Sequence, residues 1–429
     1  MSVVDSLLVA GAGPKGIAIA AKAAALAATG LPAPEVTVVD PLGVAGHWHG
    51  QSGYTDGRRQ LGTRPEKDIG FPYLPSWGDR SEEVNTRMQA LSWHGYLMAT
   101  QQLGEWVDRG CPRPSHGRWG DYITWAAETA GITVRRARIG AVDRVGGRWL
   151  AEVGSEVIEA DGLVFTGPGE ALQLPGHTAG HPRLLDGRTA WQHLASLPEK
   201  IQTACVIGGG ETAGAITTAL LEVLDPSAQI ELISTEGALF TRGESFTESH
   251  MYTDPAVWLK LPERQRRAFI RRTDRGVFSV SLQSVLDQAD RVHTVLGRVR
   301  RVHPASDAVE IEIDDGHETS RVRYDLVVTA IGFDALWWLP LFTEAAYAAL
   351  AQAAGSSGRV ETRDLERSIG LDLAVEDLTP ALHLPVLAGP AQGPGFPNLS
   401  CLGLLADRVL QPYLTRASQL RQEYRTTDA

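Results

Sequence analysis

Two copies of one nucleotide-binding pattern constrain this chain of 429 residues more than any other feature. In each copy a short apolar run leads into closely spaced glycines and then into an alanine-containing helical segment. The first copy reads LLVAGAGPKGIA near the start of the chain, and the second reads CVIGGGETAG at 205–214. A strand, a tight glycine turn and a helix in this order begin a βαβ unit with a parallel sheet. The sequence therefore predicts an α/β fold with two Rossmann-like dinucleotide-binding domains.

The first pattern places its glycines at Gly11, Gly13 and Gly16. The first glycine permits the turn, the second lets the backbone approach a pyrophosphate, and the third lets helix and strand pack closely. The helix N-terminus then presents free N–H groups to the phosphates. The following apolar run, EVTVVD, ends at Asp40, whose carboxylate can accept hydrogen bonds from ribose hydroxyls. We expect this loop to bind a dinucleotide.

The second pattern repeats the spacing with Gly208, Gly210 and Ala213, again between a strand and a helix. Glu211 and Thr212 open that helix, so both lie where a bound pyrophosphate would meet the helix N-terminus. The glycine-x-glycine-x-x-alanine form of the pattern is also used for dinucleotides. We expect a second dinucleotide here.

The strand that follows the second pattern ends without an acid. The chain has Ser234 and Thr235 at this end, and Arg242 follows on the next loop. A hydroxyl and a guanidinium suit the 2′-phosphate of NADP(H), although Glu236 lies close and Arg242 could instead form a surface ion pair. Two such domains in one chain predict FAD in the first and NADPH in the second, with a hydride passing from nicotinamide to flavin.

The order of the remaining strand signals predicts that one domain is inserted into the other. Strands that end in small residues at 163–169 and 326–333 are typical of the crossings between such domains. Helical elements near 334–384 are expected to contribute to the substrate site. The predicted ranges are 1–195 and 325–429 for the FAD-binding domain and 196–324 for the NADPH-binding domain.

Composition excludes several classes of protein. The formal net charge of −11 argues against a nucleic-acid partner, because a phosphate backbone needs a basic surface. The basic segment at 264–272 is interpreted as the solvated face of a helix, or alternatively as a neighbour of a phosphorylated cofactor. The three cysteines, Cys111, Cys205 and Cys401, are far apart and form no CxxC. They can build neither a thiolate zinc site nor the redox pair of a disulfide reductase, and we expect no metal.

The apolar N-terminal stretch does not predict a membrane segment. Lys15 and Lys22 interrupt it, glycines break it, and no basic region precedes it. We therefore expect neither a signal peptide nor a transmembrane helix, and a cytoplasmic protein. A homo-oligomer is expected.

Longer stretches resemble the flavin-dependent N-hydroxylating monooxygenases of siderophore biosynthesis, and among them the mycobactin-type L-lysine N6-hydroxylases. The resemblance covers almost the whole chain. It is carried by YTDGRRQLGTRPEKDIGFPY (54–73), LSWHGYLMAT (91–100), VIGGGETA (206–213), LFTRGESF (239–246), RTDRGVFSV (272–280) and QGPGFPNLSCLGLLADRVL (392–410).

The resemblance implies hydroxylation of the terminal amine of L-lysine with NADPH, FAD and O₂, through a flavin C4a-hydroperoxide. The amine must be neutral to attack, although a free lysine amine has a pKa of about 10.4. A desolvated pocket would lower that pKa and exclude water. Alternatives are an ornithine or other amine N-hydroxylase, an uncoupled NADPH oxidase, and a non-catalytic flavin-binding module. The sequence does not separate free from acylated or carrier-bound lysine.

The resemblance also implies roles for residues after the first βαβ unit. Trp48 and His49 would lie beside the flavin, and Gln60 would follow them at the reaction site. Lys67 would bind the α-carboxylate of the substrate, because an amino-acid carboxylate needs a fixed cation. The alternative is that Lys67 forms a surface ion pair with Glu66 or Asp68.

Further contacts are implied near the end of the second domain and near the C-terminus. Ser249 stands where the family has a substrate-binding asparagine. Asp274 and Arg275 replace part of the family's TNYSV segment. The resemblance implies that Asp274 contacts the substrate and that Arg275 contacts NADPH. The last helix follows Asn398, Leu399 and Ser400, and its N–H groups could stabilise negative charge on the flavin; Ser400 would also face the substrate. Asn398 or Ser400 could alternatively be an ordinary helix cap.

Overall fold

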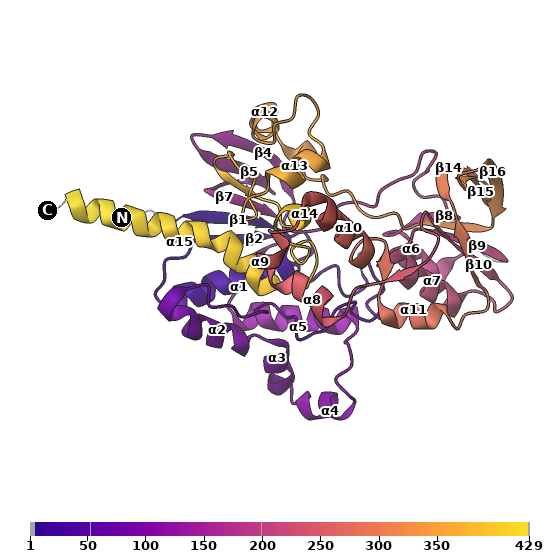
Figure 1. Cartoon of the computed structure of the whole chain (residues 1–429), viewed down its shortest axis with the longest axis horizontal. Helices are drawn as coiled ribbons and strands as arrows, with labels where there is room; N and C mark the ends of the chain where they lie inside the picture. The colour runs from indigo at the N-terminus through magenta and orange to yellow at the C-terminus, as the bar shows by residue number, and fades with distance from the viewer. Residues whose placement is uncertain (1–4, 52, 199, 428–429) are drawn as a thin grey trace.

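The computed structural model describes residues 5–51, 53–198 and 200–427, with side chains as far as Leu414. Its first sheet has five parallel strands, and the run Leu7–Val9 at its centre is fully enclosed by apolar neighbours (Figure 1). Helices α1 (Pro14–Ala28), α5 (His116–Thr129) and α15 (Leu402–Thr427) pack together beside it. In spatial order the strands are β18 (Ala381–His383), β7 (Gly162–Phe165), β1 (Ser6–Ala10), β2 (Glu35–Val39) and β3 (Val134–Arg135).

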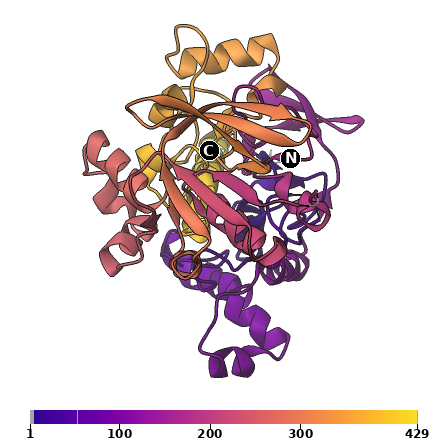
Figure 2. The same ribbon diagram turned by 90° about the vertical axis from the view of Figure 1, so that its right-hand side faces the viewer.

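A second parallel sheet forms the other end of the molecule and faces the viewer in Figure 2. Its central strand pairs on both sides with buried apolar strands, and α7 (Glu211–Val223) and α11 (Val280–Leu286) contact each other on one face. In spatial order the strands are β13 (Val292–Leu296), β10 (Gln229–Ser234), β9 (Thr203–Ile207), β17 (Leu326–Thr329) and β8 (Leu184–Asp186). The predicted fold with two Rossmann-like domains is confirmed.

Each parallel sheet carries an antiparallel three-stranded sheet. The alternating pattern of β15, with Val309, Ile311 and Ile313 buried, shows why these segments form strands with one covered face. A short parallel pair, β11 (Phe240–Thr241) and β12 (Val277–Phe278), stands apart from them. The antiparallel sheets are β4 (Ile139–Val145), β5 (Arg148–Val153) and β6 (Glu156–Ala160), and β14 (Arg298–Ala305), β15 (Ala308–Asp314) and β16 (Thr319–Tyr324).

The second sheet extends beyond the predicted range 196–324 at both ends, which corrects the predicted boundaries. β8 at 184–186 and β17 at 326–329 were assigned to the FAD-binding domain, yet β17 pairs with β9 and β8 pairs with β17. Both strands are short and fully buried, so their sequences do not indicate which of the two sheets they join. Their pairing with strands more than 100 residues away in the chain places them in the second sheet.

The helices between the two sheets also differ from the predicted domain division, because they were expected in the second domain and pack on the first. Figure 1 shows α8 (Phe246–Thr253), α9 (Pro255–Trp258) and α10 (Glu263–Thr273) at the centre of the molecule. α10 contacts α14 (Gly389–Gln392), and a guanidinium nitrogen of Arg266 donates to the carbonyl of Ala391 at 2.7 Å. These helices belong in sequence to 196–324 but pack on the C-terminal part of the first domain.

Most of the remaining helices belong to the first domain, whereas α6 (Ala190–His193) contributes Ala190 and Trp191 to the core of the second. Of those expected near 334–384, α12 packs against β4, while α13 contacts α14 and so lies next to the central helices. No helix in the described residues is long and apolar enough to cross a membrane. The bounds are α2 (Ser81–Ala90), α3 (Trp93–Ala99), α4 (Leu103–Asp108), α6 (Ala190–His193), α12 (Glu344–Ala353) and α13 (Thr362–Ser368), with 3₁₀ turns at Gly78–Arg80, Leu194–Ser196 and Leu339–Leu341.

Candidate active site

The first glycine loop has the geometry that phosphate binding requires. Gly11 has a φ of 107°, which other residues rarely adopt, and a Cβ on Gly16 would lie 2.0 Å from the Gly11 carbonyl oxygen. A Cβ on Gly13 would meet no atom within 4 Å. Gly13 caps α1 without a side-chain hydrogen bond, so the first N–H groups of the helix face open space. This space fits a pyrophosphate.

Asp40 lies where a ribose acid is expected, at the end of β2, and it is buried. Its carboxylate accepts the N–H of Ala12 at 3.0 Å and the N–H of Leu42 at 2.8 Å. Each oxygen keeps further lone pairs after these bonds. Asp40 therefore fixes the glycine loop and retains acceptor capacity for a ribose diol.

The second glycine loop is built in the same way but has different neighbours. Gly208 has a φ of 144°, and its Cβ would lie 2.3 Å from the carbonyl oxygen of Ala330. Gly210 caps α7 without a side-chain hydrogen bond. The nearest atoms to a Cβ on Gly210 are those of Gly276, at 3.8 Å. The turn that carries Arg275 thus lies beside the open end of α7.

Ser234 occupies the position that Asp40 holds in the first domain. It is buried, its hydroxyl accepts the N–H of Glu236 at 3.2 Å, and its oxygen lies 2.8 Å from an ideal Cβ on Gly209. Thr235 beside it is exposed. The hydroxyl of Ser234 therefore touches the second glycine loop where an acid would repel a ribose phosphate.

The side chains that open α7 are enclosed. The carboxylate of Glu211 accepts the N–H of Ser279 at 2.6 Å, and burial raises its pKa above the ordinary value. The methyl group of Thr212 lies 3.2 Å from an ideal Cβ on Gly187, at the end of β8. Both predicted NADPH residues thus lie at the glycine loop, with their side chains against the protein.

Arg242 does not join Ser234 as the sequence predicted. Its guanidinium donates to the Ser400 hydroxyl at 3.1 Å, lies 3.8 Å from the Asp274 carboxylate and is 5.4 Å from the ring centre of Tyr252. In the described residues no hydrogen bond links it to Ser234. The segment that follows β10 runs toward the first domain through β11, and this carries Arg242 to the C-terminal segment instead.

Asp274, Asn398 and Ser400 form one connected group. The Asn398 amide donates to Asp274 at 2.8 Å and to the Pro394 carbonyl at 2.9 Å, and its oxygen accepts the N–H of Ser400 at 2.9 Å. Burial raises the pKa of Asp274, while Arg242 opposes this shift. Because α15 begins at Leu402, Asn398 forms a turn ahead of the helix and does not cap it, and its amide holds a carboxylate; Leu399 beside it is half-buried.

Lys67 is half-buried and has no ion-pair partner within 4.0 Å in the part of the chain that the structure describes. Burial lowers its pKa, and the neighbouring Arg242 lowers it further. The alternative partners are engaged elsewhere: Glu66 is 3.2 Å from Arg64, and Asp68 accepts hydrogen bonds from other groups. The donors to Asp68 are the Tyr73 hydroxyl at 2.7 Å and the N–H groups of Gly70 and Trp93, both at 3.1 Å.

The predicted flavin-side residues lie along the loops that precede Lys67. Trp48 packs edge-on against His116 with ring centres 5.2 Å apart, and His49 is 3.8 Å from the Asp121 carboxylate. Gln60 is exposed, and its backbone forms a bridge to Ser115. No side-chain hydrogen bond of Gln60 is present in the described residues, so its amide is available to a ligand.

Two predicted site residues have unremarkable surroundings. Ser249 is half-buried on α8, and its hydroxyl makes no hydrogen bond within the described residues. Arg275 is about half exposed, and its guanidinium lies 3.8 Å from Glu366 on α13. The structure thus brings Arg275 to the first domain, and only its backbone neighbour Gly276 lies at the second glycine loop.

Lys15 is a candidate that the sequence analysis did not select. It lies between Gly13 and Gly16, and its ammonium group donates to the carbonyl of Pro397 at 2.6 Å. Burial lowers its pKa to about 8, although Cys401 and Asp274 oppose the shift. Its position inside the glycine loop was the available signal. Lys15 connects the first phosphate site to the segment of Asn398 and Ser400.

The cysteines and acidic groups support no other chemistry. Cys111, Cys205 and Cys401 are all free thiols. In the part of the chain that the structure describes, no group of three or more histidine, cysteine, aspartate or glutamate side chains could hold a metal ion. The polar side chains that lie close together are those described above between the two glycine loops, namely Lys15, Arg242, Asp274, Asn398 and Ser400.

Comparisons with known proteins agree with this arrangement. A family of L-lysine 6-monooxygenases and L-ornithine 5-monooxygenases matches residues 87–335. The L-lysine N6-monooxygenase MbtG of Mycolicibacterium paratuberculosis is 41% identical over 414 residues, which cover 95% of this chain and 95% of that protein. The chain therefore belongs to the L-lysine 6-monooxygenase/L-ornithine 5-monooxygenase family, as the resemblance predicted.

Solved structures show the same fold. The lysine monooxygenase NbtG from Nocardia farcinica, known for an unprecedented conformation of its NADPH domain, is 40% identical with a TM-score of 0.83 over 95% of this chain and 100% of its own. The Kutzneria sp. 744 ornithine N-hydroxylase KtzI, with reduced FAD, NADP⁺ and L-ornithine, has a TM-score of 0.74 over 98% of this chain and 100% of its own. At 16% identity, that second likeness shows the fold alone.

Proposed function

We propose that this enzyme hydroxylates the terminal amine of L-lysine, with FAD in the first glycine loop and NADPH in the second, in the biosynthesis of a hydroxamate siderophore. Family membership supports the reaction class, and the 41% identical relative is named for L-lysine and the N6 position. The observation that supports an amino-acid substrate is Lys67, a half-buried cation with no ion-pair partner among the described residues, and the choice of lysine rests on the relative's name.

The residues at the first loop fit FAD. The open space at Gly13 and the uncapped start of α1 suit the pyrophosphate, and Asp40 keeps acceptor capacity for the ribose. When bound, the flavin would activate O₂, so that one oxygen atom of O₂ passes to the substrate and the other leaves as water. Trp48, His49 and Gln60 would position its ring system from one side, and the Asn398–Ser400 segment from the other.

Lys67 and its neighbours would orient the amino acid. An ammonium group that is partly desolvated binds a carboxylate strongly, and binding would restore the pKa of Lys67 toward its ordinary value. Asp274 is held by Asn398 and Arg242, so it is fixed rather than free to pair with Lys67. Ser249 and Ser400 would contact the rest of the substrate through their hydroxyl groups.

The substrate amine would lose its proton on entering the site. A buried amine with no carboxylate beside it has a lowered pKa, so enclosure favours the neutral form that reacts. Asp274 would oppose this if it lay next to the amine, and its hydrogen bonds with Asn398 keep it engaged elsewhere. The protein thus acts by positioning and by excluding water.

Several finer points belong to the same proposal. The hydroxyl of Ser234 would donate a hydrogen bond to the 2′-phosphate of NADPH, with Glu211 and Thr212 shaping the start of α7 and Arg275 near the nicotinamide. We propose O₂ as the oxidant and a cytoplasmic homo-oligomer; the free thiols of the cysteines agree with a reducing compartment. Light scattering of the FAD-loaded protein measures the oligomeric state.

A product assay tests the proposed function. FAD-loaded protein is given NADPH and either L-lysine or L-ornithine, and hydroxylamine is measured beside peroxide. We expect hydroxylated lysine as the main product, with little from ornithine. A preference for ornithine would make the chain an ornithine enzyme, and peroxide without hydroxylamine for every amine would show that it is an NADPH oxidase.

A further inference from the structure

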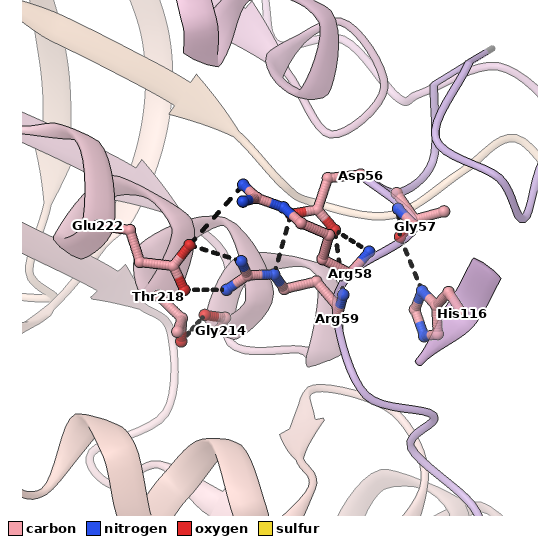
Figure 3. A network of polar contacts seen from close by, with 9 residues as sticks. Asp56, Gly57, Arg58, Arg59, His116, Gly214, Thr218 and Glu222 are labelled. Carbon is pink, nitrogen blue, oxygen red and sulfur yellow. Dashed lines mark hydrogen bonds and ion pairs between the residues drawn. The ribbon is translucent and has the colours of Figure 1, made fainter. Parts of the chain in front are cut away.

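The loop that carries Gln60 is bonded to the far end of α7, the helix that begins at the second glycine loop, and lies close to its near end. At the far end of α7, the guanidinium of Arg59 donates two hydrogen bonds to the carboxylate of Glu222, at 2.8 and 2.7 Å (Figure 3). At the near end, an ideal Cβ on Gly62 would lie 3.2 Å from a carboxylate oxygen of Glu211. The short segment from Arg59 to Gly62 therefore runs along the helix.

Asp56, on the same loop, holds the side chain of Arg59 in position. Its Nε donates to Asp56 at 3.1 Å, and the same carboxylate accepts the N–H groups of Arg58 and Arg59, at 2.8 and 3.1 Å. The side chain of Arg59 is only 11% exposed, whereas that of Arg58 is 73% exposed. A buried fork that matches a carboxylate in two places fixes direction as well as distance.

The charges of the pair reinforce each other. The hydrogen bonds with Arg59 lower the pKa of Glu222, and those with Glu222 raise the pKa of Arg59. Because the carboxylate pKa falls below its ordinary value, Glu222 stays ionised throughout the neutral range, and the pair does not change over the pH of an enzyme assay.

Glu222 is too far from the second glycine loop to touch a bound nucleotide. It lies 11 residues after Glu211 on a continuous helix, which corresponds to about 16 Å at 1.5 Å per residue. Any effect of the pair on the reaction must therefore act through the placement of α7 against the loop of Gln60.

We propose that Arg59 and Glu222 are positioning residues that hold the nicotinamide-binding domain in register with the flavin-binding domain for hydride transfer. The proposal rests on the proposed function. The pair joins two domains that must bring two rings together, and it connects directly to the loop that bears Gln60. A second ion pair, from Arg113 to Glu244 at 2.8 Å, ties the segment that precedes α8 to the first domain, so it does not duplicate the contact that Arg59 makes with α7.

The test measures flavin reduction and substrate oxygenation separately. In Arg59→Gln and in Glu222→Gln, anaerobic bleaching of bound flavin by NADPH should slow by roughly five- to tenfold, as for loss of a well-formed charged contact. The double variant should be no slower than the slower single variant, because all three lack the same contact. The reaction of dithionite-reduced enzyme with O₂ and lysine, and the thermal midpoint, should stay near wild type in all three.

Matched controls separate positioning from general charge effects. Arg300 and Asp314 form an ion pair of similar length, 2.6 Å, within the second domain, and Arg300→Glu should leave every rate unchanged. Single variants that reduce flavin at the wild-type rate would overturn the proposal. A double variant whose slowing equals the product of the two single effects would also overturn it, because the two residues would then act independently. Failure of the proposed function has another signature, since the wild-type protein itself would then give no hydroxylamine.

Discussion

The two glycine loops share a backbone design and differ in the residue that ends the following strand. In the first domain Asp40 accepts two N–H groups of the loop region and keeps acceptor capacity. In the second, the hydroxyl of Ser234 lies directly against Gly209 and carries no charge. The loop geometry makes both sites suitable for a pyrophosphate, whereas we propose that the strand end selects a ribose diol in the first and tolerates a phosphate in the second.

The largest expected effect comes from filling the packing contact inside the first loop. In Gly16→Ala the new Cβ would lie 2.0 Å from the Gly11 carbonyl oxygen, so strand and helix must separate. We expect a loss of at least about 3 kcal/mol of stability and loss of FAD. Urea unfolding and flavin absorbance measure both. An unfolding midpoint within error of wild type would show that the loop can relax, and the packing argument would fail.

A change outside both loops should spare both nucleotides. Lys67→Ala removes the carboxylate partner, and we expect kcat/KM for lysine to fall by about 100-fold, as for removal of a buried charged partner. Flavin reduction by NADPH should stay within about twofold of wild type. Lys67→Arg keeps the charge and should recover part of the activity. Unchanged hydroxylamine formation in Lys67→Ala would refute the assigned role.

Matched substitutions at the open glycines address the two sites one at a time. A Cβ has free space at Gly13 and at Gly210, so Gly13→Ala and Gly210→Ala should both fold. The first should weaken FAD binding by roughly tenfold and the second NADP⁺ binding by a similar factor, because each methyl group enters the pyrophosphate site. Calorimetric titration with each nucleotide measures the effects. Both nucleotides responding to the same variant would mean that one loop serves both.

Local patterns explain which nucleotide sites could be proposed from the sequence. The glycine spacings and the strand ends at Asp40 and Ser234 depend on residues that are close in the chain, whereas the role of Lys67 is implied by the family resemblance. The structure argues against the alternative ion pair with Asp68, because that carboxylate accepts hydrogen bonds from Gly70, Tyr73 and Trp93.

Contacts between distant segments could not be predicted. Lys15 donates to Pro397, which is 382 residues away, and β17 joins the second sheet through pairing with β9. Arg242 looked like a phosphate ligand because it follows Ser234, yet the fold turns it toward Ser400. In each case an apolar or basic residue has several possible partners, and only the packing of the two domains selects one.

The smallest expected effect concerns the lysine inside the first loop. The pKa of Lys15 falls from its ordinary 10.5 to about 8 in the folded protein, so between these values the unfolded chain binds more protons. Between pH 8.5 and 9.5 the stability of FAD-free wild type should therefore rise, relative to Lys15→Met, by at most about 1.4 kcal/mol. Urea midpoints at three pH values measure it. Parallel curves for the two proteins would contradict the lowered pKa.

The measurement that tests the account most directly is the rate of anaerobic flavin reduction by NADPH and by NADH, in wild type and in Ser234→Asp. An aspartate at the strand end repels a 2′-phosphate and accepts a ribose diol, as Asp40 does in the first domain. Wild type should prefer NADPH, and the variant should shift the ratio toward NADH by at least about tenfold while it keeps FAD. An unchanged ratio, or loss of FAD from the variant, would contradict the assignment of NADPH to the second loop.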